Sequence, residues 1–299
     1  MPTSRVALIQ GDDRYSNTRA ALAALGEAVS LAGKQRIVVK PNFVTTNRPL
    51  AATHADAVRA VLDYLVERGA ARITLAEGPA MGSFRQGLEH FGYTAWLGRY
   101  PVDLVDLNDD EGVPVPAYDS RLGPITLRVA RTVLESDLRI SVSPPKTHDA
   151  VNVTLALKNY AVGSLVRGQK CAIHQGCAGI NLNLYKLAAH VAPHLAILDG
   201  FEAMEGNGPT QGTAVDWRIA IASTDFLAAD GLACHLMGFD LDEIGYLHYC
   251  QRMGLGQGRI EDMEIVGNVA PEAVARRFRP HRSYRELLEW QIVDVERYL

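Results

Sequence analysis

The sequence lacks the features that mark several large classes of protein. It has no uninterrupted apolar run of about 18 residues, the length that a membrane-spanning helix needs. Its start, MPTSRVALIQGDD, lacks the charged and then apolar pattern of a secretory signal. The formal net charge of -4 gives no basic field for nucleic acid. These absences predict a cytoplasmic protein that binds neither nucleic acid nor membrane.

Cysteine is scarce, with 4 residues in a chain of 299. Cys171 and Cys177 lie close together with His174 between them, but Cys234 and Cys250 do not form the second close pair that a thiolate metal site usually has. We therefore expect reduced, partly buried thiols rather than a structural metal or an iron–sulfur cluster.

Several well-known catalytic motifs are also missing. The chain has no G-x-S-x-G nucleophile elbow, no P-loop, no G-x-G-x-x-G after its first strand and no H-E-x-x-H. Its composition, 47% hydrophobic and 21% charged, is that of an ordinary globular protein with a sizeable core. Any chemistry must then come from imidazole, ammonium, carboxylate and glycine-rich backbone.

Short apolar runs alternate with helical patterns along the chain. Strands are predicted at 5–9, 37–39, 73–76, 102–107, 125–129, 138–142, 195–198, 218–222 and 264–266, and helices at 16–28, 54–68, 84–91, 181–192, 226–237, 244–253 and from 283 onward. The alternation predicts an α/β fold in which helices cover both faces of a mostly parallel sheet. We interpret residues 1–299 as a single domain, with two intimate α/β subdomains left open. Residues 102–130 are the candidate insertion or subdomain, a small antiparallel excursion.

The predicted C-terminal helix is unusually apolar for a peripheral helix. It therefore packs either on the core or on a second copy of the chain as a homodimer. Its apolar side chains are Tyr284, Leu287, Leu288, Trp290, Ile292 and Val295.

Polar clusters follow one predicted strand after another. In an open parallel sheet the ligand crevice lies beyond the carboxyl ends of the strands, so these clusters should converge. Asp225 alone would be an ordinary helix N-cap. The crevice is predicted to be lined by Lys40, Asn42, Glu77, Lys146, His148, Asp199 and Asp225.

The stretch from 138 to 160 is the most informative. In PPKTH, Pro145 stiffens the chain that presents Lys146 and His148, and LALKN then places Lys158 and Asn159 in an apolar segment. A solvated loop followed by a snorkelling lysine is the alternative interpretation. His174, in a glycine-flanked setting, supplies a second imidazole, with a hydrogen-bonded structural role as its alternative.

These residue types suit proton transfer on a small anionic metabolite. Lys40, Lys146 and Lys158 would bind a carboxylate or phosphate and stabilise negative charge, while His148 and His174 act as acid and base. Isomerisation, elimination or cyclisation is the predicted reaction type. The predicted catalytic residues are His148, Lys146, His174 and Lys158. The predicted substrate-binding residues are Lys40, Asn42, Glu77 and Asn159.

A second candidate chemistry uses a divalent metal. Asp199, Glu202 and Glu205 are spaced three apart, which would align them on one stripe of a helix, and Gly206 and Gly208 let backbone approach a ligand closely. A metal-dependent enzyme on a carboxylate or phosphate therefore stays open. So do an anionic ligand-binding or cofactor-binding protein and a redox accessory protein.

The motifs also resemble a known family. KPNFV, TTNRP…ATH, ITLAEGP, ISVSPPKTH, TLALKN, LDGFEAMEGNGPTQG and S-T-D…AADG…LMG are similar to signature blocks of the domain of unknown function 362 family, from about Val38 to Gly267. The resemblance implies a fold and a site, with little settled chemistry. Some members carry a ferredoxin-type segment, whose close cysteine runs are absent here, which argues against a redox role.

Overall fold

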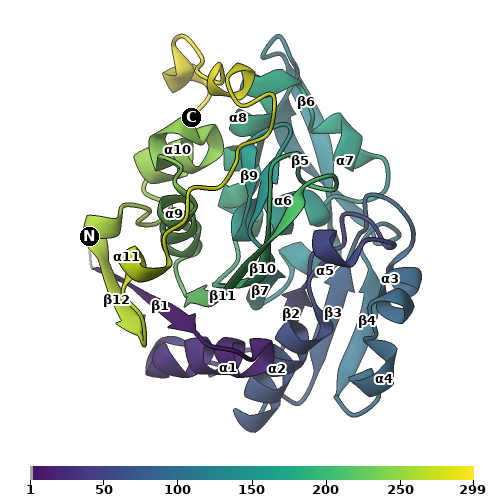
Figure 1. The fold of residues 1–299 in the computed structure, drawn as a ribbon. Helices are drawn as coiled ribbons and strands as arrows, with labels where there is room; N and C mark the ends of the chain where they lie inside the picture. Colours follow the sequence, from purple (N-terminus) through teal and green to yellow (C-terminus); the bar gives the residue numbers. More distant parts are fainter. Residues whose placement is uncertain (1–2) are drawn as a thin grey trace.

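Residues 3–299 are described by a computed structural model (Figure 1). The strands are β1 (Ser4–Gln10), β2 (Ile37–Lys40), β3 (Ile73–Glu77), β4 (Val102–Asp106), β5 (Gly112–Tyr118), β6 (Pro124–Ala130), β7 (Leu138–Ser143), β8 (Lys146–His148), β9 (Asn152–Thr154), β10 (Leu195–Glu205), β11 (Thr213–Ser223) and β12 (Met263–Gly267). The helices are α1 (Arg14–Ala24), α2 (Ala55–Glu67), α3 (Phe84–His90), α4 (Thr94–Leu97), α5 (Arg131–Leu134), α6 (Ala156–Gly163), α7 (Gln169–Ala172), α8 (Gly176–Val191), α9 (Phe226–Met237), α10 (Gly245–Arg252) and α11 (Pro271–Val274).

One large sheet organises the chain, with the strand order β12-β1-β11-β10-β7-β2-β3-β4. Every neighbouring pair from β10 to β4 is parallel, and so is β12 with β1. Along this order the antiparallel joins are those of β11 with β1 and with β10. Beside it, β8 pairs in parallel with β10 and antiparallel with β9. The prediction of a mostly parallel α/β sheet is confirmed.

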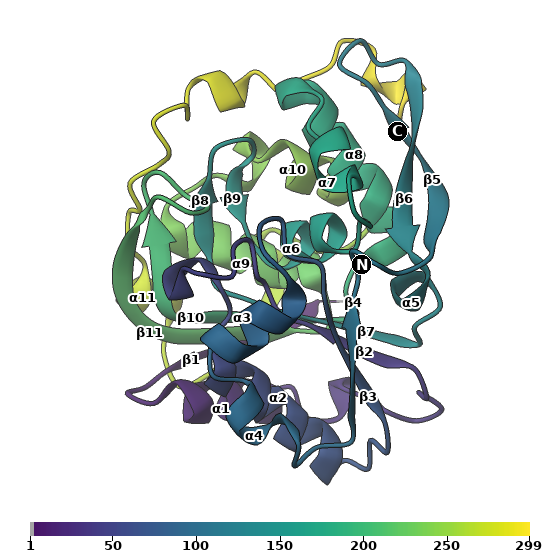
Figure 2. The ribbon, with the colours of Figure 1, turned by 90° about the vertical axis from the view of Figure 1, so that its right-hand side faces the viewer.

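Helices cover both faces of this sheet (Figure 2). On one face, apolar side chains of α1, α2, α3 and α4 form a core with the sheet. On the other face, α6, α8, α9 and α10 form a second and larger core. The helices follow their sequence signals closely: α9 starts at its N-cap Asp225 and ends at Gly238, which adopts φ 79°.

Strands β5 and β6 form a separate antiparallel hairpin outside the main sheet. The hairpin is fastened to α8 by Asn183, whose amide nitrogen donates to the Tyr118 carbonyl while its side-chain oxygen accepts from the Tyr118 N–H, both at 2.8 Å. Strand β4, which opens the range 102–130, is instead the edge strand of the main sheet.

The C-terminal helix predicted from residue 283 onward is wrong. Between residues 283 and 299 the chain makes only two short 3-10 turns, Glu286–Leu288 and Val295–Arg297. Trp290 is buried against His248 and Tyr249 and donates its indole N–H to the Glu243 carbonyl at 3.0 Å. The apolar spacing thus reflects anchoring of an irregular segment to the core. Pairing with a second copy stays a prediction.

Within residues 3–299, no helix is both long enough and apolar enough to span a membrane.

Candidate functional site

A cavity of about 310 Å³ opens at the carboxyl edge of β2, β3 and β7, next to α6. Its walls come from the loops after β2 and β3, from the β8–β9 hairpin, from α6 and α7, and from the loop after β10. Because β2 pairs in parallel with both β3 and β7, their carboxyl ends meet at this edge, as expected for a ligand crevice. Six predicted site residues line it: Asn42, Glu77, His148, Lys158, Asn159 and His174.

Lys40 lies behind the cavity wall as a fully satisfied cation. Its ammonium is completely buried and donates to Glu77 Oε2 at 2.7 Å, to Asn159 Oδ1 at 2.8 Å and to the Pro41 carbonyl at 2.9 Å. An ammonium has three N–H donors, and all of them are used here. Lys40 therefore holds the floor of the site together and has no donor left for a ligand.

Lys146 is also held by the protein. Its buried ammonium donates to Asn42 Oδ1 and to the Ala51 carbonyl, and the Asn42 amide donates to Asn159 Oδ1 at 2.9 Å. One continuous network thus joins Lys40 and Lys146 through two asparagines. Burial lowers the pKa of Lys146 to about 7. The network places both lysines behind the same cavity, but neither residue lines it, contrary to the prediction.

Gly163, in the last turn of α6, gives Lys40 the space it needs. A Cβ on Gly163 would lie 2.0 Å from Lys40 Cε and 2.2 Å from Nζ. Both distances are far inside van der Waals contact, so any larger residue would displace the ammonium from Glu77.

Lys158 differs from these two lysines. Its side chain is buried and lines the cavity, yet within residues 3–299 its ammonium has no hydrogen-bond acceptor in the protein. Burial lowers its pKa to about 8. Lys158 lies on α6, whose N-terminal end is held by α9. The Asp230 carboxylate on α9 accepts from the Ala156 and Leu157 N–H groups at 2.8 and 3.0 Å. A rigid helix start therefore presents a free amine to the cavity.

His148 presents a donor to the cavity. The Ala150 N–H donates to its Nδ1 at 2.9 Å, so that nitrogen is the acceptor and the proton of a neutral ring sits on Nε2. The Asp149 carboxylate also lies 3.0 Å from this Nδ1, but its side chain is 57% exposed and free to turn into solvent, whereas the Ala150 N–H is fixed by the backbone and decides the tautomer. Burial and the nearby charge of Lys158 lower the pKa of His148, which keeps the ring neutral near pH 7. Its free group is Nε2–H.

His174 offers the cavity a hydrogen-bond acceptor, where His148 offers a donor. Its Nδ1 lies 2.8 Å from the Lys170 carbonyl, and because a carbonyl only accepts, Nδ1 carries the proton. The lone pair of the neutral ring is then on Nε2. His174 lines the cavity but is an exposed residue, and partial burial of its ring together with the charge of Lys158 lowers its pKa as well. The two imidazoles around the cavity thus offer one N–H donor and one basic nitrogen.

The sequence interpretation missed Thr154 and Lys170. Thr154 lines the cavity and is buried, and its hydroxyl oxygen has no hydrogen-bond partner in residues 3–299. Lys170 also lines it and donates to Asn108 Oδ1 at 2.8 Å and to the Leu165 carbonyl. The spacing of Lys170 and His174, one helical turn apart, was an available signal. Nothing in the sequence marked the threonine.

The glycine-rich loop after β10 borders the cavity through Pro209 and Thr210. A Cβ on Gly208 would lie 2.0 Å from the Thr147 carbonyl oxygen, so this loop packs directly on the β8 backbone. Gly206 adopts φ 75° and donates its N–H to the Arg279 carbonyl at 2.7 Å. Both glycines shape the wall of the cavity without lining it.

The proposed metal stripe of Asp199, Glu202 and Glu205 is wrong. These residues lie in strand β10 and not in a helix, with a register irregularity between Gly200 and Glu202, so they do not share one face. Asp199 Oδ1 is 3.2 Å from Arg14 Nε, whereas Glu205 accepts from the Arg279 N–H at 3.0 Å. Among residues 3–299, no three His, Cys, Asp or Glu side chains are grouped for a metal ion.

Asp225 does not belong to the crevice either. Strand β11 is antiparallel to β10, so its carboxyl end lies at the opposite edge of the sheet. Asp225 caps α9 there, accepting from the Leu227 N–H at 2.9 Å, and it also accepts from the Ser4 hydroxyl at 2.6 Å. The ordinary N-cap explanation holds for this residue.

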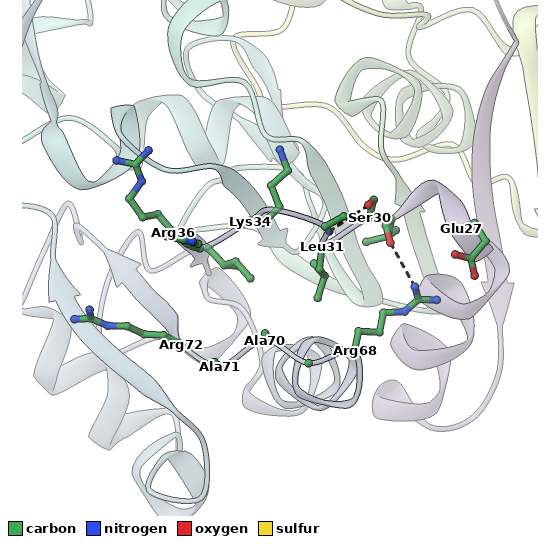
Figure 3. A pocket seen from close by; sticks show the side chains of 14 residues that line it. Glu27, Ser30, Leu31, Lys34, Arg36, Arg68, Ala70, Ala71 and Arg72 are labelled. Carbon is green, nitrogen blue, oxygen red and sulfur yellow. Dashed lines mark hydrogen bonds between the residues drawn. The ribbon is translucent and has the colours of Figure 1, made fainter.

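A second hollow, of about 760 Å³, lies at the amino ends of β2 and β3 (Figure 3). Three of its basic side chains have partners in the protein: Arg36 bonds Asp137, Arg72 bonds Asp103 and Arg68 donates to the Val29 carbonyl. None of the predicted site residues lines it. Although it is larger, this hollow is at the wrong edge of a parallel sheet for the usual ligand crevice.

Comparison with known proteins identifies the family. A family model described as Domain of unknown function (DUF362) matches residues 37–235. The chain belongs to the DUF362 family. The resemblance drawn from KPNFV, PPKTH and LALKN is thereby confirmed, and every residue that lines the cavity lies within the DUF362 match.

A curated relative supports this assignment. The Thylakoid-associated protein sll1697 of Synechocystis sp. is 30% identical to this DUF362 chain over 227 residues, which cover 74% of the chain and 68% of that protein.

Among solved structures, the lactate racemase apoprotein from Thermoanaerobacterium thermosaccharolyticum is similar, with a TM-score of 0.50 and 12% identity over 80% of this chain. The DUF362 chain spans only 57% of the length of that protein. A protein from Thermotoga maritima matches with a TM-score of 0.48 and 14% identity, covering 76% of this chain and 60% of its own. At these identities the likeness concerns the fold alone.

Proposed function

We propose that this protein is an enzyme that moves a proton on a small anionic metabolite bound in the 310 Å³ cavity. One observation carries the proposal: within residues 3–299, Lys158, a largely buried lysine whose ammonium has no protein partner, lines the same cavity as a histidine that offers an N–H donor and a histidine that offers a lone pair. Isomerisation and elimination are the reaction types that use such a pair.

The anionic character of the substrate follows from the charges around the cavity. Lys158 and Lys170 line it. Burial disfavours the charged form of an amine and lowers the pKa of both to about 8. Glu77 and Asp149 also line it, but the charge of Glu77 is matched by Lys40 at 2.7 Å, and Asp149 lies against His148 with its side chain 57% exposed to water. A ligand carboxylate or phosphate would supply the counter-charge for Lys158.

The two imidazoles divide the proton transfer between them. In their neutral forms, His174 Nε2 takes a proton from a carbon next to the anionic group, and His148 Nε2–H donates to the oxygen on which negative charge develops. Burial, followed by the charge of Lys158, lowers the pKa of both rings, so both remain neutral near pH 7. His148 therefore serves as a hydrogen-bond donor rather than as a group that titrates near neutrality.

The fold comparison is compatible with this proposal. The lactate racemase apoprotein is named for a reaction on a small carboxylate and has a similar fold. Its 12% identity carries no site residue over to this chain. The proposal therefore stands on the cavity itself.

Hydrogen exchange tests the proposal even while the substrate is unidentified. The protein is incubated in D₂O with a panel of 2-hydroxy acids, 2-oxo acids, amino acids and phosphate monoesters. Proton NMR follows the carbon-bound hydrogens that each class can lose: those next to the carboxylate or phosphate group, or, in 2-oxo acids, those next to the ketone. We expect one chemical class to lose this signal in proportion to enzyme concentration. Failure of every class to exchange with folded protein would contradict the proposal. Saturable binding of an acid without exchange would instead indicate a ligand-binding protein.

A further inference from the structure

We propose that Lys158 forms an imine with the carbonyl carbon of a small 2-oxo acid, a covalent step that rests on the proton-transfer function proposed above. The geometry on which it stands is a largely buried lysine whose primary amine faces a cavity and has no acceptor in residues 3–299. A lysine used only as a fixed charge would be expected to have partners, as the other lysines of this region do.

The four lysines near the site differ in the number of protein acceptors that their ammonium groups have. Lys40 donates to three acceptors, and Lys146 and Lys170 donate to two each. Lys158 has no acceptor in the part of the chain that the structure describes. Three of the four are thus fixed in place by protein acceptors, and the fourth keeps its nitrogen free at the cavity surface.

A nucleophilic lysine must be unprotonated for part of the time. Burial lowers the pKa of Lys158 to about 8, so a sizeable share of the amine is neutral at mildly alkaline pH. Desolvation is one of the recognised ways of activating a lysine for imine formation.

The rest of the cavity suits a carboxylate with an adjacent carbonyl. Lys170 lines the same cavity and supplies positive charge for the carboxylate. The Thr154 hydroxyl, buried and without a partner in residues 3–299, supplies a donor or acceptor for an oxygen of the ligand. An orphaned buried hydroxyl costs free energy until a ligand satisfies it.

Lys158, His148 and His174 together supply the groups that imine formation needs. The Nζ lone pair of Lys158 attacks the carbonyl carbon while His148 Nε2–H donates a hydrogen bond to the oxygen on which negative charge develops. His174 Nε2 takes one proton from the nitrogen and passes it to that oxygen, and the second N–H proton follows the same route as the hydroxyl group leaves as water. Amine and ketone thus yield imine and water. A protonated imine withdraws electrons from the neighbouring carbon and makes its hydrogen easier for His174 to remove.

Reductive trapping tests the imine. The full-length protein is incubated with pyruvate or glyoxylate and sodium cyanoborohydride, and intact mass followed by peptide mapping locates the adduct. We expect one adduct per chain, on Lys158, that requires both acid and reductant. Lys158→Arg, which keeps the charge but cannot form an imine, should lose it, whereas the exposed-site control Lys34→Arg should retain it. Thermal melts establish that both variants are folded.

The outcomes separate this inference from the proposed function. Adducts spread over surface lysines, or no adduct with either acid, would overturn the imine. So would carbon–hydrogen exchange that persists at the wild-type rate in Lys158→Arg, a result that leaves proton transfer by the histidines intact. An adduct on Lys158 without exchange of any acid in D₂O would support the imine and contradict the proposed function instead.

Discussion

Replacing Glu77 with alanine should lower the free energy of unfolding by about 3–5 kcal/mol, the usual cost of leaving one member of a buried ion pair without its partner. Lys40 and Glu77 are 0% and 2% exposed at their side chains, and the Glu77 carboxylate also accepts from the Gly78 N–H at 2.8 Å. Its loss would leave the Lys40 charge without a counter-ion in the core and the Gly78 N–H without its acceptor.

Urea unfolding followed by circular dichroism measures this change. The control is Glu89→Ala, which breaks the exposed pair of Glu89 with Arg85 and should barely move the transition. The double variant Lys40→Met/Glu77→Met should be milder than Glu77→Ala, because it removes both charges together. Equal effects of Glu77→Ala and Glu89→Ala would mean that the Lys40–Glu77 pair does not hold the floor of the site.

Substitution of His174 by alanine should reduce the rate of carbon–hydrogen exchange roughly 10²–10⁴-fold, since it removes the basic nitrogen that faces the cavity. The pKa of His174 is lowered by burial, so the neutral, basic form dominates at pH 7. In the wild type the rate should fall on acidification, as the ring becomes protonated below its usual range. In the variant this acid limb should vanish.

Exchange rates measured as a function of pH test this prediction. His190→Ala is the matched control, because His190 is an exposed residue in the last turn of α8, away from the cavity, and its loss should leave both rate and pH profile unchanged. A structural role for His174 predicts a lower melting temperature with turnover within a few-fold, which would end its assignment as the base.

The sequence predicted which side chains lie near one another where strand direction was regular. Lys40 and Glu77 are the last residues of the parallel strands β2 and β3, and His148 ends β8, which comes directly after the parallel strand β7. The rule for carboxyl ends failed at Asp225 because β11 is antiparallel, and a run of apolar residues does not reveal the direction of its strand. The spacing of Asp199 and Glu205 suits a helix, but pairing of β10 with β11 extends the segment instead.

Other features of the site depend on contacts that no local pattern encodes. The tautomers of His148 and His174 are set by the Ala150 N–H and the Lys170 carbonyl, backbone groups that any residue would provide. Whether a lysine has a partner depends on Asn42 and Asn159, which bind Lys146 and Lys40 rather than Lys158. Such outcomes follow from the folded geometry, and the sequence alone could only nominate the residue types.

The ring tautomers of the two histidines test the account most directly, because they can be measured without a substrate. Nitrogen-15 NMR of histidine-labelled protein at neutral pH, with resonances assigned from His148→Ala and His174→Ala, reports which nitrogen carries the proton in each ring. The account predicts a neutral His148 protonated at Nε2 and a neutral His174 protonated at Nδ1. Two rings with the same tautomer, or a His148 protonated at Nδ1 and bonded to Asp149, would contradict it.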